Sequence, residues 1–130
     1  MRLKGTWNIK DYTFNCVSIV PQLNALSSNS NLSDISIQYG ENSEKQWYTY
    51  IYVSNKLLYH SYDLFNDDTQ FYFDPNRVYD SLCNKWFFTP FRLVKNVGSN
   101  WKVFKLYEND LNIVLNTDTG EYKIFLKNSK

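Results

Sequence analysis

The chain has 130 residues, 18% of them aromatic, and a formal net charge of +1. This length predicts a single domain over residues 1–130, because a second compact core would need roughly another hundred residues. The aromatic content excludes disordered and collagen-like chains. A Gly-rich phosphate loop is not expected, because the chain has only four glycines and they are not clustered. The near-neutral charge argues against nucleic-acid binding, which depends on phosphate neutralisation.

The sequence carries no signal for a membrane or for secretion. No apolar run approaches the ~18 residues that a membrane helix requires, and the first residues lack the apolar core of a signal peptide. Cys16 and Cys83 form no Cys-x-x-Cys pair and are too few for a disulfide framework, so we expect two reduced thiols. These features predict a cytoplasmic protein without membrane contact.

Apolar and polar residues alternate in the first half of the chain, as they do in half-buried strands. The strands predicted there cover residues 6–16, 35–39, 45–53 and 57–65. Strand 45–53 carries large side chains on both faces, with Tyr48, Tyr50 and Tyr52 on one face and Trp47, Ile51 and Val53 on the other. Ser54-Asn55-Lys56 supplies a hairpin turn before the return strand.

The second half of the chain continues the same pattern and adds helical signals. The strands predicted there cover residues 69–73, 86–95, 101–108, 111–116 and 121–127. Pro90 interrupts strand 86–95, so an edge position or a bulge is expected at that point. Asp74-Pro75 is a typical helix start, and a further helical turn is expected over Pro21 to Leu26.

Eight or more short strands at roughly ten-residue spacing indicate an antiparallel barrel or a sandwich. We favour the barrel, because several strands carry large residues on both faces and a sandwich of this size has one interior. The predicted fold is therefore all-β, a single antiparallel barrel with one or two short helices. Strands 6–16 and 121–127 are expected to lie near each other.

No group of residues has the spacing of a catalytic or metal site. His60 is the only histidine, and no His-x-x-x-His or Cys-x-x-Cys grouping supplies it with partners. Asp67-Asp68 and Asp74 fit a solvated turn better than a cation site. We expect no metal, no bound cofactor and no catalytic side chain.

Clustered tyrosines are the strongest functional signal. Tyr48, Tyr50, Tyr52, Tyr59 and Tyr62 fall on two adjacent predicted strands. A core built for stability favours Leu, Ile and Val, whereas tyrosine rings with hydroxyls suit a cavity wall that stacks a flat conjugated ligand. The alternative is a tyrosine ladder that faces solvent. Arg77 and Arg92 fit either a role in holding a ligand carboxylate or the role of surface charges.

Two segments resemble known families. Gly5-Thr6-Trp7 resembles the Gly-x-Trp that opens many lipocalin-type barrels. Residues 44–84 resemble the T-type phycobiliprotein lyases, lipocalin-like barrels that bind an open-chain tetrapyrrole (bilin) and help to attach it to a cysteine of a light-harvesting protein. The central hairpin of that family has a pattern like Tyr-Arg-x-Arg, a strand, a turn and Ile-Glu-Asn-Tyr, followed by a short helical stretch and Gly-Cys. Spacing back from Tyr62 puts His60 at the family's Glu and Gln46 at one of its Arg residues, and Leu82-Cys83-Asn84 falls at its Gly-Cys.

The resemblance implies a bilin, such as phycoerythrobilin, as ligand or substrate, and a phycobiliprotein acceptor as partner. The replaced Glu and Arg fit a reduced member that binds bilin as a chaperone and attaches it poorly or not at all. The expected ligand-binding residues are Gln46, Tyr48, Tyr50, Tyr52, His60, Tyr62, Asp63, Arg77 and Arg92. The alternatives are a generic carrier of fatty acid or haem, and a ligand-free interaction domain. The sequence fixes neither enzymatic activity nor oligomeric state.

Overall fold

The computed structural model describes residues 4–25, 31–41, 43–44, 47–63, 70–73, 99–118 and 120–129. These residues form an antiparallel nine-stranded sheet with one short α-helix and one 3-10 turn. None of the helices within these ranges is long and apolar enough to cross a membrane. The all-β class expected from the sequence is confirmed.

The strands form a meander in which the first strand pairs on one side with a strand from the N-terminal part of the chain and on the other side with the last strand. The N-terminal part contains β1 (Gly5–Phe14), β2 (Val17–Ser18), β3 (Ile35–Glu41), β4 (Trp47–Val53) and β5 (Lys56–Asp63). The C-terminal part contains β6 (Gln70–Phe73), β7 (Ser99–Leu106), β8 (Asp110–Thr117) and β9 (Gly120–Asn128). Helix α1 (Val20–Asn24) follows β2, and the 3-10 turn η1 (Leu32–Asp34) precedes β3.

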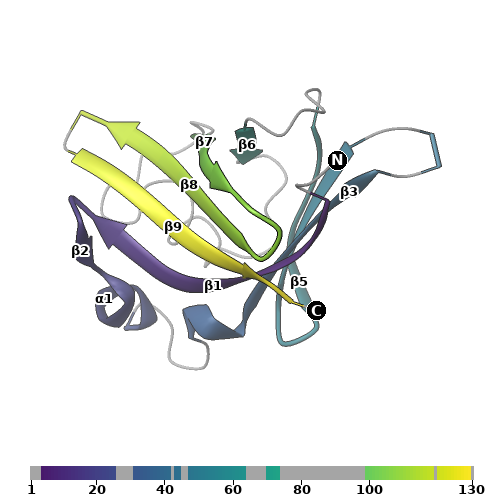
Figure 1. Ribbon diagram of the computed structural model, residues 1–130. Coiled ribbons are helices and arrows are strands. Elements are labelled where there is room, and N and C mark those ends of the chain that lie inside the picture. The colour runs from purple at the N-terminus through teal and green to yellow at the C-terminus, as the bar shows by residue number, and fades with distance from the viewer. Residues whose placement is uncertain are drawn as a thin grey trace.

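The sheet order is β5-β4-β3-β1-β9-β8-β7-β6, with β2 paired to β1. Strand β1 pairs with β3 on one side and with β9 on the other, as predicted for strands 6–16 and 121–127. The sheet therefore curls away from β1 in two directions (Figure 1). We call these two parts of the sheet its arms, one made of β3, β4 and β5 and the other of β9, β8, β7 and β6. Among the described residues β5 and β6 are its two ends, and no pairing between them closes it.

Most predicted strands match the observed ones, with differences at their ends. The first strand stops at Phe14 instead of residue 16, because Asn15 and Cys16 adopt positive φ angles of 49° and 69° that a strand cannot contain. The chain turns there into β2, which the sequence did not predict. Cys16 is a free, exposed thiol in this turn. The helix starts one residue early, at Val20 instead of Pro21, and ends at Asn24.

Several predictions fall outside the described residues. They are strand 86–95 with Pro90, the helix starting at Asp74-Pro75, the aspartate pair Asp67-Asp68, and the thiol of Cys83.

The turn between β4 and β5 has the geometry that its sequence predicts. Ser54 and Asn55 have φ angles of 45° and 73°, the conformation of a two-residue hairpin turn whose twist matches that of the flanking strands. This turn sets the register of the hairpin and therefore decides which side chains of β4 and β5 lie opposite each other.

The core is unusually rich in aromatic rings. The largest fully buried side chains are those of Trp7, Trp101, Tyr12, Tyr39, Tyr59, Leu23 and Leu32. Tyr12 on β1 meets Trp101 on β7 edge to face, with 5.9 Å between ring centroids and 86° between ring planes. Leu23 of α1 also belongs to this cluster, so the short helix covers part of it. The core thus draws on both arms of the sheet.

Candidate functional site

The tyrosines that the sequence singled out form a continuous row of rings across β4 and β5. Register pairing sets Tyr50 opposite His60 and Tyr48 opposite Tyr62. Ring centroids lie 4.7 Å apart for Tyr48 and Tyr50, 6.1 Å for Tyr50 and Tyr52, and 4.5 Å for Tyr50 and His60. We call Tyr48, Tyr50, Tyr52 and His60 the tyrosine row, and Tyr50 is its centre.

The tyrosine row stands on the face of β4 that points away from the core. Thr49 and Ile51 are 0% exposed and Val53 is 7% exposed, whereas Tyr48, Tyr50 and Tyr52 are half-buried. Because successive side chains of a strand point to opposite faces, the row occupies the outer face. These tyrosines therefore do not form the wall of an interior cavity, contrary to what the sequence led us to expect. The β-branched side chains of Thr49, Ile51 and Val53 fill the core face.

Tyr59 is separated from the row because it lies on the opposite face of β5 from its neighbour His60. The register of β4 against β5 shifts between Ile51 and Tyr52, so that Leu58 and Tyr59 are both buried in the core. Tyr59 therefore lies opposite Ile51 on the core face, while His60 is on the outer face. The sequence groups Tyr59 with the other tyrosines only because it lies on the same pair of strands, and Tyr59 is not among the expected ligand-binding residues.

Gly40 provides the space in which Tyr48 lies. The two residues are paired across β3 and β4, and a Cβ at Gly40 would lie 2.5 Å from the Tyr48 hydroxyl oxygen and 2.7 Å from its Cζ. The tyrosine ring thus lies across bare glycine backbone, an arrangement that rescues a strand glycine by covering it. Sequence reasoning read Gly40 as the end of a strand, but it lies inside β3.

The remaining predicted site residues are described only in part. Tyr62 and Asp63 lie on β5, opposite Tyr48 and Trp47, and only their backbone is described. Gln46, Arg77 and Arg92 lie outside the described residues. The structure therefore brings together Tyr48, Tyr50, Tyr52 and His60, and adds the backbone position of Tyr62.

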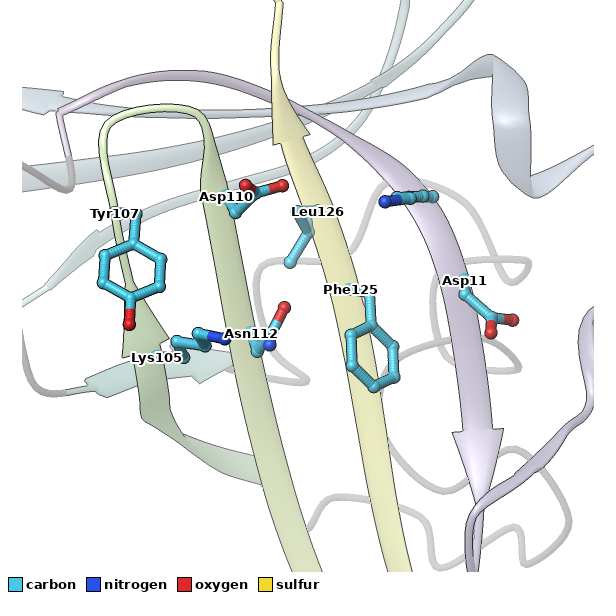
Figure 2. A pocket seen from close by; sticks show the side chains of 8 residues that line it. Asp11, Lys105, Tyr107, Asp110, Asn112, Phe125 and Leu126 are labelled. Atoms are coloured by element: carbon cyan, nitrogen blue, oxygen red, sulfur yellow. The ribbon is translucent and has the colours of Figure 1, made fainter.

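A second candidate site, which the sequence did not reveal, lies on the outer face of the other arm. Figure 2 shows the side chains that line it, from strands β1, β7, β8 and β9 and, for Tyr107, from the turn after β7. It is a groove of about 380 Å³ lined by Lys10, Asp11, Lys105, Tyr107, Asp110, Asn112, Phe125 and Leu126. We call it the outer groove.

The described residues of the two sites do not form a metal centre. Within the residues described here, no three His, Cys, Asp or Glu side chains come together in a way that could hold a metal ion. Comparison of the chain with protein-family models, with curated proteins and with solved structures finds no match. Function is therefore inferred from the chain's own residues.

Proposed function

We propose that this chain is a small lipocalin-like barrel that binds an open-chain tetrapyrrole on its tyrosine row. In this role it acts in the cytoplasm as a bilin chaperone or as a phycobiliprotein chromophore lyase. The contact of four rings in one row, Tyr48, Tyr50, Tyr52 and His60, is the observation that carries the proposal.

The strand order supports the lipocalin-like part of the proposal. A meander in which β1 pairs with both β3 and β9 is the order of an up-and-down barrel, and one further pairing, between β5 and β6, would complete it. Trp7, the tryptophan of the opening Gly-x-Trp, is 0% exposed. This burial supports the proposal, because in lipocalin-type barrels the tryptophan of that motif fills the closed end of the interior.

The dimensions of the tyrosine row suit a linear conjugated ligand. Tyr48 and Tyr52 are four residues apart on β4, about 13 Å at the rise of a strand. A flat molecule with several rings in a line can stack along this length, because every ring has a face that an aromatic side chain can cover. Since the row is on the outer face, the ligand lies against β4 and β5 from outside.

The lyase half of the proposal needs little from the protein chemically. A thiol adds to an activated vinyl group when the two are held in a productive geometry, so the binding surface mainly fixes the conformation of the chromophore. The thiol belongs to the acceptor protein. The chain therefore has to bind and orient the chromophore, and the acceptor supplies the reactive group. The rings and hydroxyls of the tyrosine row are suited to binding and orienting a chromophore.

The first test is a titration followed by visible absorption. Wild-type protein is mixed in turn with biliverdin, phycoerythrobilin, haem and a fluorescent fatty acid. We expect a red shift and sharpening of the bilin band, because stacking extends and rigidifies the chromophore. A response to haem or fatty acid alone would support the generic carrier instead. No response to any probe would leave the interaction domain and end the bilin proposal.

Tyr50→Ala is expected to weaken bilin binding about ten- to hundredfold, because loss of one stacking ring costs about 1–3 kcal/mol by analogy with base–aromatic stacking. The matched control is Tyr107→Ala, which removes a 57% exposed tyrosine on the other arm. The same titration is run on both variants, with far-ultraviolet circular dichroism to check folding. Equal weakening in both, or weakening in Tyr107→Ala alone, would contradict binding on the tyrosine row.

Gly40→Ala is expected to disturb the tyrosine row although no residue of the row is substituted. Its methyl group would occupy the place of the Tyr48 ring, so Tyr48 must rotate away from Tyr50. One lost aromatic contact corresponds to about two- to tenfold weaker binding of bilin. In a Tyr48→Ala background the same Gly40→Ala change should have no further effect on affinity. An additional loss there would show that Gly40 acts by another route.

A further inference from the structure

We propose that the outer face of β7, β8 and β9 binds single-stranded nucleic acid, with bases stacked on its aromatic rings and phosphates held by its lysines. The outer groove is the centre of this face (Figure 2). The site is independent of the tyrosine row, which lies on the other arm of the sheet.

Three aromatic side chains lie on this face, on different strands. Phe104 is on β7, Tyr107 is in the turn that follows it, and Phe125 is on β9. Phe104 and Tyr107 are exposed, and Phe125 is half-buried. Figure 2 shows the rings of Tyr107 and Phe125 both nearly face-on. Sheets that bind RNA use rings on neighbouring strands in this way, as platforms on which bases stack.

A bulge in β7 brings a ring and a lysine to the same face. The register of β7 against β8 shifts between Val103 and Lys105, which leaves Phe104 as the extra residue. Strict alternation would turn Phe104 and Lys105 to opposite faces. Instead Phe104 contacts Lys123 of β9 while Lys105 lines the outer groove, so both lie on the outer face. The bulge in β1 likewise leaves Lys10 as the extra residue, on the rim of the groove.

Two lysines already contact these rings. Nζ of Lys123 lies 4.7 Å from the centroid of the Phe104 ring, and Nζ of Lys105 lies 5.0 Å from the centroid of the Tyr107 ring. Contacts of this kind are weak where solvent reaches them. Each ammonium can therefore turn from its ring to the phosphate of a nucleotide whose base is stacked there.

Further lysines flank the rings on both outer strands of the face. Lys127 lies two residues beyond Phe125 on β9, about 7 Å away, and so shares its face. Lys102 follows the buried Trp101 on β7 and so faces outward. The phosphates of a strand that lies across the rings would therefore have lysines on either side.

Positive charge predominates on this face although the net charge of the chain is only +1. Glu121 pairs with Lys123, whose Nζ lies 3.4 Å from its Oε1. The Asp11 carboxylate points away from the groove (Figure 2) and accepts a hydrogen bond of 2.8 Å from the Ser18 hydroxyl. Asp110 lines one end of the groove. Within the described part of the chain, four exposed lysines of this face form no ion pair: Lys10, Lys102, Lys105 and Lys127.

The floor of the groove favours a nucleic acid over a membrane or an acidic protein. Asn112 lies beside Phe125 in the register of β8 and β9, and its amide both donates and accepts. Bases offer donors and acceptors along their edges, so a base stacked on Phe125 can hydrogen-bond this amide. A flat lipid surface would not reach a half-buried ring and amide in this groove. An acidic peptide would use the lysines and leave the rings without a partner.

Fluorescence anisotropy of a labelled octa-adenylate tests the proposal, starting in about 50 mM salt. We expect saturable binding. A plot of the logarithm of the association constant against the logarithm of the salt concentration should have a slope of about −2 to −3, because each of three to four lysine–phosphate contacts on a single strand contributes about −0.7. A hairpin duplex should bind more weakly, because its bases cannot stack on the rings.

Three results would overturn the proposal. The first is absence of saturable binding, and the second is equal affinity for the duplex. The third is binding of polyglutamate or of phosphatidylserine vesicles without binding of octa-adenylate, which would identify an acidic protein or a membrane as the occupant.

Two variants separate the contribution of charge from that of stacking. Lys105→Gln should weaken binding about two- to fivefold and make the salt slope shallower by about 0.7. Phe125→Ala should weaken binding about five- to hundredfold and leave the slope unchanged. The matched control is Lys56→Gln, which removes an exposed lysine of the other arm and should change neither quantity. Equal effects of Lys105→Gln and Lys56→Gln would overturn the assignment of this face, even if Phe125→Ala fails to fold.

Discussion

Trp101→Ala is expected to lower the free energy of unfolding by about 3–5 kcal/mol, the usual cost of deleting a buried tryptophan. Trp101 is 0% exposed and meets Tyr12 edge to face. It therefore links β7 to β1 through the core, although β9 and β8 separate the two strands in the sheet. A domain of this kind has a total stability of about 5–15 kcal/mol, so the variant should lose a large share of its stability.

Urea denaturation followed by far-ultraviolet circular dichroism measures this loss. The control is Phe104→Ala on the same strand, where the residue is 63% exposed and the Lys123 ammonium lies 4.7 Å from the ring centroid. That change should cost no more than about 1 kcal/mol. Similar losses in both variants would mean that the core does not depend on the Tyr12–Trp101 contact.

Local patterns in the sequence predict most of the strands and the β4–β5 hairpin. The turn Ser54-Asn55 has residues that tolerate positive φ, so its position and the pairing of Tyr50 with His60 follow from local chemistry. The irregularities do not follow in the same way. The bulge at Lys10 is set by pairing with β9, which is distant in sequence. The bulge at Phe104 lies inside the β7–β8 hairpin, and period-two alternation alone does not fix which residue is the extra one.

The sequence identifies the residues of the tyrosine row but not the face on which they lie. Strand β4 has large side chains on both sides, so alternation alone leaves two choices. The choice is made by packing against β3, where Ile35 and Ile37 are buried and share a face with Val53 and Ile51. Core packing thus selects the β-branched face and turns Tyr50 outward.

The outer groove could not be predicted because its residues are distant in sequence. Asp11, Lys105, Asn112 and Phe125 become neighbours only when β1, β9, β8 and β7 pair. One local signal exists: Lys10-Asp11 places two polar residues in succession within an alternating strand, which is what a bulge requires. Read alone, this signal predicts an irregular strand and gives no ligand.

Gly120→Ala is expected to lower the free energy of unfolding by about 2–4 kcal/mol, combining backbone strain with lost hydrogen bonds. Gly120 opens β9 with a φ of 155°, and an added Cβ would lie 2.5 Å from Asn15 Oδ1 and 2.7 Å from Phe14 Cζ. Asn15 exchanges two hydrogen bonds with the backbone of Glu121, each of 2.9 Å. The methyl group would therefore push the turn after β1 away from the β8–β9 hairpin.

Gly5→Ala separates the two causes, because Gly5 has a similar φ of 148° but its nearest neighbours to an added Cβ are 3.8 and 4.0 Å away. Gly5→Ala should show the backbone strain without displacement of a neighbouring turn. The difference between the two variants in the free energy of unfolding, measured by urea denaturation, therefore gives the contribution of the Asn15 contact. Native-state hydrogen exchange should accelerate at the amides of Asn15 and Glu121 in Gly120→Ala and not in Gly5→Ala. Equal destabilisation with no local change in exchange would show that the turn after β1 does not hold β9 in place.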